Sequence, residues 1–243
     1  MSTAPAERPT SAERNQRFAN VRPKDAATLI LIDRSGPTFK VLMGRRHNGH
    51  AFLPGKFVFP GGRVEVSDRR VPATGALDAY DEARLMRGVA RSSPLKARAF
   101  AVAAIREAFE ETGLMIGRKV DTPPTLPEGW LSFAQAHVQP DIGELHFVAR
   151  AITPPRRPRR FDTRFFAADA LAIAHRIESV VGPDAELVEL TWVPMAEAQE
   201  LGLVAITRLV LIDLAARMDA GFGHELPVPY YRMLNGRSVR ELL

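Results

Sequence analysis

The 243-residue sequence contains no cysteine, which excludes disulfide bonds, thiolate zinc sites and cysteine nucleophiles together. It also has no run approaching 18 uncharged apolar residues, so it predicts no membrane-spanning helix. Neither sign of charge dominates, because 33 Lys and Arg against 28 Asp and Glu leave a net charge of +5. That mild basicity suits an anionic ligand without requiring nucleic acid. The six histidines show no metal-ligand spacing, and we interpret them as structural.

The remaining composition is that of a globular protein, with 46% hydrophobic and 25% charged residues. A chain of this length can bury one sizeable core. Residues 1–20 are polar and proline-bearing without an apolar period, which predicts a flexible N-terminal arm. The arm lacks the apolar stretch of a secretory signal, and its glutamates argue against an organelle transit peptide, so we expect a cytoplasmic protein. Residues 21–243 are expected to form a single domain.

Strands and helices mix along the whole chain, which predicts an α/β or α+β fold. We expect strands over 27–32, 40–43, 57–59, 144–152, 164–167 and 185–193, and helices around 77–89, 168–181 and 204–220. Residues 221–243 are expected to form an irregular tail. The strongest helix is predicted over 94–112, because Ser93 is a favourable N-cap, Pro94 suits the first helical position and Gly113 suits a left-handed C-cap.

Three glutamates of this helix, Glu107, Glu110 and Glu111, fall on one side of it. The last two lie where the helix dipole is negative, so each carboxylate costs roughly 0.3–1 kcal/mol there. No Lys or Arg follows at the spacing that would offset the repulsion, and an ordinary solvated acidic face is the alternative reading. Carboxylate oxygens suit Mg²⁺ or Mn²⁺ rather than zinc, so we predict a divalent-cation site. Arg106 borders the cluster and can hold one carboxylate in place.

Residues 106–114, Arg-Glu-Ala-Phe-Glu-Glu-Thr-Gly-Leu, resemble the second half of the Nudix box of the Nudix hydrolases. The first half of that box is a glycine followed, after five residues, by a glutamate. Gly62 supplies the glycine, but Asp68 stands where the glutamate is expected. Asp68 and Arg106 are separated by 37 residues instead of seven, so residues 69–98 form an insertion. A split box of this kind resembles the coenzyme A diphosphatase-like branch of the family.

The resemblance implies a Nudix-type α/β/α sandwich with a mixed sheet and a partly helical inserted segment. It implies metal-dependent hydrolysis of a nucleoside diphosphate linked to another moiety, with coenzyme A or acyl-CoA cleaved to 3′,5′-ADP and 4′-phosphopantetheine. ADP-ribose, NADH and dinucleotides stay open as substrates, and so does a non-catalytic nucleotide-binding module. The expected partner is a nucleotide-diphosphate small molecule, with no membrane involved and nucleic acid disfavoured. A homodimer stays open.

The resemblance also implies individual roles. The expected metal ligands are Glu107, Glu110, Glu111 and Asp68, and the expected substrate-binding residues are Arg45, Arg46, Gly61, Gly62 and Arg63. Arg106 is expected to orient the glutamates. A general base comes from later in the chain, with Glu186 the first candidate and Glu189 and Glu144 the others. Asp68 is one methylene shorter than glutamate, so we expect it to hold Arg106 or a metal-bound water. A solvated loop edge is the alternative for Arg45 and Arg46.

Overall fold

The computed structural model describes residues 18–49 and 54–243. Most of the arm expected over residues 1–20 lies outside the described residues, and so does His50. No helix in the described part of the chain is both long and apolar enough to cross a membrane.

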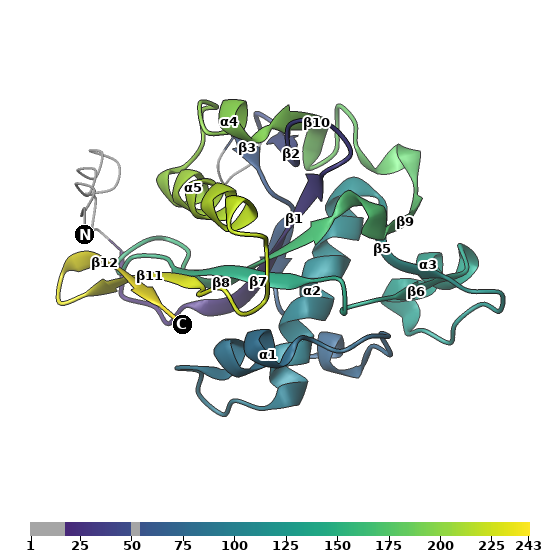
Figure 1. Ribbon diagram of the computed structural model, residues 1–243, viewed down its shortest axis with the longest axis horizontal. Helices are drawn as coiled ribbons and strands as arrows, with labels where there is room; N and C mark the ends of the chain where they lie inside the picture. The colour runs from purple at the N-terminus through teal and green to yellow at the C-terminus, as the bar shows by residue number, and fades with distance from the viewer. Residues whose placement is uncertain (1–17, 50–53) are drawn as a thin grey trace.

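A mixed sheet forms the centre of the molecule (Figure 1). Its main path runs β10-β2-β1-β8-β7-β11-β12, and within the described residues β3 and β4 add to it beside β2 and β1. β1 is parallel to β8 and β11 is parallel to β7, while the other neighbours are antiparallel. The strands are β1 (Lys24–Asp33), β2 (Lys40–Arg46), β3 (Phe57–Val58), β4 (Gly61–Arg63), β7 (His146–Ile152), β8 (Phe161–Asp169), β10 (Leu187–Pro194), β11 (Pro229–Leu234) and β12 (Arg237–Leu242).

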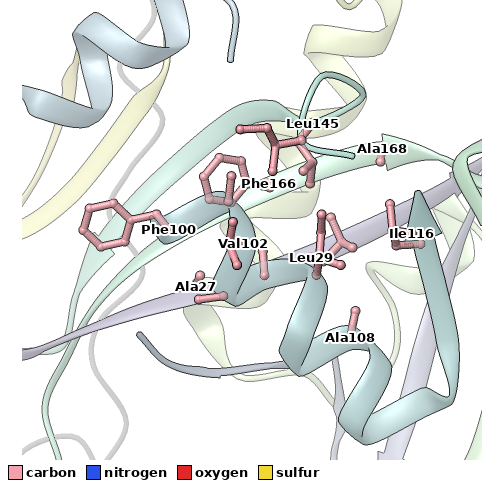
Figure 2. Packing of buried hydrophobic residues seen from close by; sticks show 14 of the residues in the cluster. Ala27, Leu29, Phe100, Val102, Ala108, Ile116, Leu145, Phe166 and Ala168 are labelled. Atoms are coloured by element: carbon pink, nitrogen blue, oxygen red, sulfur yellow. The ribbon is translucent and has the colours of Figure 1, made fainter. Parts of the chain in front are cut away.

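Helices cover both faces of this sheet. Successive side chains of a strand point to opposite faces, and β1 is apolar on both. Leu29 and Leu31 belong to the core shared with α2 (Pro94–Thr112), whereas Ile30 and Ile32 belong to the core shared with α5 (Ala205–Asp219). Figure 2 shows Leu29 among the side chains packed between α2 and the sheet. The expected α/β/α sandwich is confirmed.

The end signals of α2 act as the sequence predicts. The Ser93 hydroxyl accepts a hydrogen bond from the Lys96 amide, and Gly113 adopts a left-handed conformation with φ of 76°. The body of the helix is less amphipathic than expected, because every residue from 99 to 105 is buried. The sheet covers one side of α2, while α1 (Ala79–Met86) and the short 3₁₀ segment η1 (Ser67–Arg70) contact another. Both contacting segments lie before α2 in the chain, around the insertion.

Smaller elements surround this sandwich. A second sheet has the order β6-β5-β9. These elements are β5 (Leu114–Lys119), β6 (Val138–Pro140), β9 (Ile173–Arg176), α3 (Leu131–Gln135), α4 (Met195–Ala198), η2 (Glu128–Trp130), η3 (Ala170–Ala172) and η4 (Glu178–Val180).

Two expectations about secondary structure are wrong. Residues 168–181 are not one helix, because the Asp169 carboxylate caps the short η3 turn and β9 then pairs with β5. Residues 221–243 are not an irregular tail, because β11 and β12 form a hairpin that joins the main sheet beside β7. Asn235 and Gly236, both with positive φ, form its turn. An Asn-Gly pair between apolar segments is a strong hairpin signal, and it could have revealed these strands.

Candidate active site

One guanidinium gathers the carboxylates of α2. Arg106 Nη1 donates to Glu107 Oε1 at 2.8 Å and to Glu110 Oε2 at 2.9 Å. Its Nη2 donates to the carbonyl oxygen of Arg63 at 2.8 Å. Burial alone would lower the pKa of Arg106, but the hydrogen bonds that it donates to Asp68 and the charges of the surrounding carboxylates raise this pKa above its ordinary value. The arginine therefore stays charged and fixes two glutamates in one orientation.

Asp68 holds this arginine from the other side. Its side chain is fully buried, with Oδ1 2.9 Å from Arg106 Nε and Oδ2 3.3 Å from Arg106 Nη2. Oδ2 also accepts a hydrogen bond from the Glu65 amide at 2.7 Å. The structure thus contains the predicted contact between Asp68 and Arg106, across the insertion. Because both of its oxygens are already engaged, Asp68 is placed to orient Arg106 rather than to offer an open oxygen.

Glu111 is the most deeply buried of the three glutamates, with 8% of its surface exposed. Burial raises its pKa to about 8, and the negative charges of Glu186 and Glu107 add to this effect, while Arg46 and the Gly61 amide oppose it. Burial likewise raises the pKa of Glu107, which Arg106 partly offsets. Glu111 Oε2 has no hydrogen-bond partner within the described residues. An ordinary solvated acidic face does not fit this burial.

Residues from the sheet face Glu111. Arg46, at the end of β2, lies with Nη2 3.9 Å from Glu111 Oε1 and donates from Nη1 to Glu186 Oε1 at 2.5 Å. Glu186 just precedes β10, the neighbour of β2, and 41% of its side chain is exposed. The structure therefore brings Glu186, the first candidate for a general base, to the same carboxylate cluster.

The glycines of β4 allow the close approach of α2. A Cβ atom on Gly62 would lie 2.3 Å from Glu107 Oε2, and one on Gly61 would lie 2.6 Å from the carbonyl oxygen of Ala27. Both distances are shorter than real Cβ contacts. A side chain at Gly61 would collide with the backbone of β1, and one at Gly62 would displace the Glu107 carboxylate, so both positions favour glycine.

Other expected site residues lie elsewhere. Arg45 Nε donates to Glu189 Oε2 at 2.9 Å. Since Arg45 and Arg46 are consecutive in β2, they point to opposite faces, so this pair lies on the side away from Glu111. Glu144 pairs with Arg118 at 3.3 Å. Arg63 contributes its carbonyl oxygen to Arg106, while the residue itself is exposed.

The residues fit a divalent cation, although they do not enclose one as they stand. Among the residues that the structure describes, no group of three or more His, Asp or Glu is arranged to hold a metal ion. Arg106 already contacts one oxygen each of Glu107 and Glu110. The buried, unpartnered Oε2 of Glu111 is the observation that fits a cation. The available donors are carboxylate oxygens, which suit Mg²⁺ or Mn²⁺.

Sequence reasoning missed one feature of this region. It did not anticipate that Glu111 would be buried, although its neighbours Ala108 and Thr112 lie on the packed side of α2. The burial depends on Arg46 and Glu186, which lie far from α2 in the sequence and approach Glu111 only in the folded chain.

In this site a carboxylate-rich helix packs on a glycine-containing strand at one face of a mixed sheet. This is the arrangement expected for a Nudix hydrolase. The chain matches no model of a known protein family. It is 29% identical over 211 residues to the human acyl-coenzyme A diphosphatase NUDT19. The match covers 67% of this chain and 55% of the human protein. The chain thus spans about half the length of that curated relative.

The crystal structure of a NUDIX hydrolase from Alicyclobacillus acidocaldarius has a similar fold. The TM-score is 0.58 and the identity is 27%, over 80% of this chain and 92% of the other. With the motif on α2, these similarities in sequence and in fold support the Nudix hydrolase family for this chain.

Proposed function

We propose that this protein is a divalent-metal-dependent diphosphatase that hydrolyses a nucleoside diphosphate linked to another moiety. The observation that carries the proposal is the buried Glu111 carboxylate, which has an unpartnered oxygen beside Glu107 and Glu186. Several carboxylates held this close repel each other, and a cation between them removes the repulsion.

Each side chain then has a distinct task. Glu107, Glu110 and Glu111 would hold Mg²⁺ or Mn²⁺, which when bound neutralises diphosphate charge and lowers the pKa of water. Arg106 keeps two of these carboxylates in place. Glu186 is exposed enough to accept a proton from the attacking water, and Arg46 orients it. The water oxygen bonds to one phosphorus, the P–O–P bond breaks, and the leaving phosphate carries the bridging oxygen.

We propose coenzyme A or an acyl-CoA as the substrate. The support is the similarity to a human protein named as an acyl-coenzyme A diphosphatase, together with the insertion that splits the motif between Asp68 and Arg106. Cleavage at the diphosphate yields 3′,5′-ADP and 4′-phosphopantetheine or its acyl derivative.

Replacing Glu111 with Gln tests the metal site. Glu111→Gln keeps the shape of the side chain and removes its charge, so we expect kcat to fall at least 100-fold while the fold survives. Glu128→Gln, an exposed glutamate of η2, serves as the matched control and should retain wild-type activity. Near-wild-type turnover of Glu111→Gln, with cleavage that persists in excess EDTA, would contradict the proposal.

A panel of diphosphates tests the substrate. Coenzyme A, acetyl-CoA, ADP-ribose, NADH and a dinucleoside polyphosphate are each incubated with Mg²⁺ and with Mn²⁺, and the products are identified by mass. We expect the highest kcat/KM for the coenzyme A compounds. A preference of about tenfold or more for ADP-ribose or NADH would overturn the substrate, and tight binding without turnover of any compound would indicate a binding module.

A further inference from the structure

Lysines and arginines gather at one end of the main sheet. This basic end consists of the three segments 18–25, 153–162 and 232–241. Together they contain nine Lys or Arg and three Asp or Glu, an excess larger than the net charge of +5 of the whole chain. The rest of the molecule is therefore close to neutral, and the positive charge of the protein is concentrated on these segments.

Strand pairing brings the three segments together. β1 starts beside β8, with Lys24 opposite Phe161, and the Lys24 amide donates to the carbonyl oxygen of Arg160 at 3.0 Å. β7 ends beside the start of β8, and β11 runs parallel to β7, so the turn between β11 and β12 lies at the same end. Figure 1 shows β11 and β12 at the left of the molecule, opposite β5 and β6 of the second sheet.

The acidic residues of the basic end are already neutralised. Each forms an ion pair with an arginine of the main sheet: Asp25 with Arg164 at 2.9 Å, Asp162 with Arg150 at 2.6 Å and Glu241 with Arg232 at 2.9 Å. Five other cations are exposed, and their side chains make no ion pair with any described residue: Arg22, Lys24, Arg156, Arg159 and Arg237. The basic end therefore offers its positive charge to an anion outside the protein.

The loop between β7 and β8, residues 153–160, presents part of this charge on a constrained backbone. Three of its eight residues are proline, which fixes the backbone angle φ. Arg160 anchors the loop, because its guanidinium donates to the carbonyl oxygen of Val21 at 2.7 Å. A loop held in this way loses little conformational entropy when Arg156 and Arg159 bind an anionic surface.

Apolar side chains are exposed among these cations. Leu234, at the tip of the β11–β12 hairpin, is 42% exposed and lies directly opposite Arg237 in the strand pairing. Phe18 and Val21 are 51% and 46% exposed at the start of the described chain. A basic surface with protruding apolar side chains matches an anionic membrane, where cations meet the headgroups and apolar groups reach the boundary of the acyl chains.

We propose that the basic end docks on an anionic lipid membrane, with its arginines against the headgroups and Leu234 inserted between them. Single-stranded nucleic acid fits less well, because base stacking uses aromatic rings among the cations, and residues 153–160 contain none. We expected no membrane because no apolar run could span one, and a surface contact requires no such run. The proposal does not depend on the proposed diphosphatase function.

Vesicle sedimentation compares two double variants with equal loss of charge. Arg156→Gln/Arg159→Gln removes two exposed cations of the basic end, whereas Lys119→Gln/Arg176→Gln removes two exposed cations from β5 and β9 of the second sheet. Each protein is mixed with vesicles of phosphatidylcholine alone, or of phosphatidylcholine and phosphatidylglycerol in equal parts. The bound fraction is measured at low and at high salt, and circular dichroism checks that each variant is folded.

We expect wild-type protein to bind the mixed vesicles, to be released at high salt and to leave the neutral vesicles unbound. Arg156→Gln/Arg159→Gln should bind roughly 10- to 30-fold more weakly, because each cation near an anionic membrane strengthens binding about fivefold. Lys119→Gln/Arg176→Gln should bind as the wild type does. Equal weakening of both double variants, or equal binding to both kinds of vesicle, would overturn the proposal.

The hairpin tip is tested with Leu234→Ser, and its control is Leu171→Ser, at a leucine of η3 that is 91% exposed. We expect Leu234→Ser to bind the mixed vesicles about threefold to tenfold more weakly than the control, and equal binding would overturn the insertion of the tip. Tighter binding to a single-stranded oligouridylate than to mixed vesicles, lost in Arg156→Gln/Arg159→Gln, would assign the basic end to nucleic acid and overturn the membrane. Glu111→Gln should bind vesicles as the wild type does, so the two proposals are tested separately.

Discussion

At the scale of single residues, Arg106 connects most parts of the site. Its donors reach two oxygens of Asp68, one oxygen each of Glu107 and Glu110, and the carbonyl oxygen of Arg63. Removing one partner of a buried charge pair leaves the other uncompensated, which is more damaging than losing an exposed pair. The orientation of the α2 glutamates therefore depends on Asp68, a residue that is distant in the sequence.

Replacing Asp68 tests this dependence. Asp68→Asn preserves the size of the side chain but weakens its hold on Arg106, and we expect activity or Mg²⁺ affinity to fall roughly 10- to 100-fold, the range for groups that support metal ligands. Mg²⁺ titrations of kcat measure the effect, and circular dichroism checks that the variant is folded. Asp121→Asn, an exposed aspartate, is the control. Wild-type Mg²⁺ dependence in Asp68→Asn would show that Asp68 plays no part in the site.

The sequence predicted the residues that lie within one local motif. The cluster of Glu107, Glu110 and Glu111 beside Arg106 follows from helix spacing, which fixes neighbours on a helix. The sequence ranked Glu186 first as the general base but did not exclude Glu189. That choice depends on the pairing of β10 with β2, which shifts register between Leu187 and Glu189. A shift of one residue sends a side chain to the other face of the sheet, and no local pattern reveals it.

At the scale of elements, short-range signals predicted helix ends better than they predicted helix bodies. Ser93 acts through its hydroxyl and Gly113 through its left-handed backbone, both within one turn of the helix ends, so the bounds of α2 are readable in the sequence. The helix body is covered by segments far away in the chain, which its own pattern does not record. The helix predicted over 168–181 is wrong for the same reason. Part of this segment forms β9, which is stabilised by pairing with β5, a strand far away in the sequence.

Gly113 provides a test at this scale. Its φ is 76°, and an added Cβ would collide with the carbonyl oxygen of Ile177. Gly113→Ala should therefore lower the free energy of unfolding by more than about 1 kcal/mol, as measured by urea denaturation. Gly129→Ala is the control, since nothing lies within 4 Å of its added Cβ. Equal stability of the two variants would contradict the role of Gly113 as the cap of α2.

At the scale of the whole molecule, the inserted segment is part of the core. Val71, Leu77 and Leu85 are buried in the same cluster as Phe100 and Phe166. The C-terminal hairpin is equally integrated, with Tyr230 and Tyr231 buried where β11 joins β7. The fold class followed from the alternation of strands and helices, whereas these two additions could not be placed, because their partners lie elsewhere in the chain.

A partly buried cluster joins these parts. His146 of β7 stacks on His224 of the C-terminal segment with ring centroids 3.8 Å apart. His224 Nδ1 lies 2.7 Å from Asp81 Oδ2, and Asp81 belongs to α1. Burial lowers the pKa of His146 to about 3, and the positive charges of His224 and Arg217 add to the effect. Burial also raises the pKa of Asp81, which the Phe147 amide and His224 partly offset.

These shifts predict the pH dependence of stability. Between pH 6.5 and about 3 the unfolded chain binds a proton at His146 and the folded chain does not, so stability must fall as the pH falls through this window. The slope from this group is below about 1.4 kcal/mol per pH unit, because the ring is partly accessible to solvent. The raised pKa of Asp81 acts in the opposite sense at the acid end, where the folded state retains its proton more readily.

Comparing wild-type protein with His146→Phe isolates one contribution. Phenylalanine keeps an aromatic ring beside Phe222 and His224 and removes the titrating group, so the free energy of unfolding should fall less between about pH 7 and pH 5 than in the wild type. Urea denaturation at several pH values measures both profiles, and His175→Phe, at an exposed histidine of β9, controls for the loss of any imidazole. Parallel profiles for His146→Phe and wild-type protein would show that His146 titrates alike in the folded and unfolded chains. A reduced slope confined to His146→Phe would mean that acid loosens the cluster through which the inserted segment, the central sheet and the C-terminal segment hold one another.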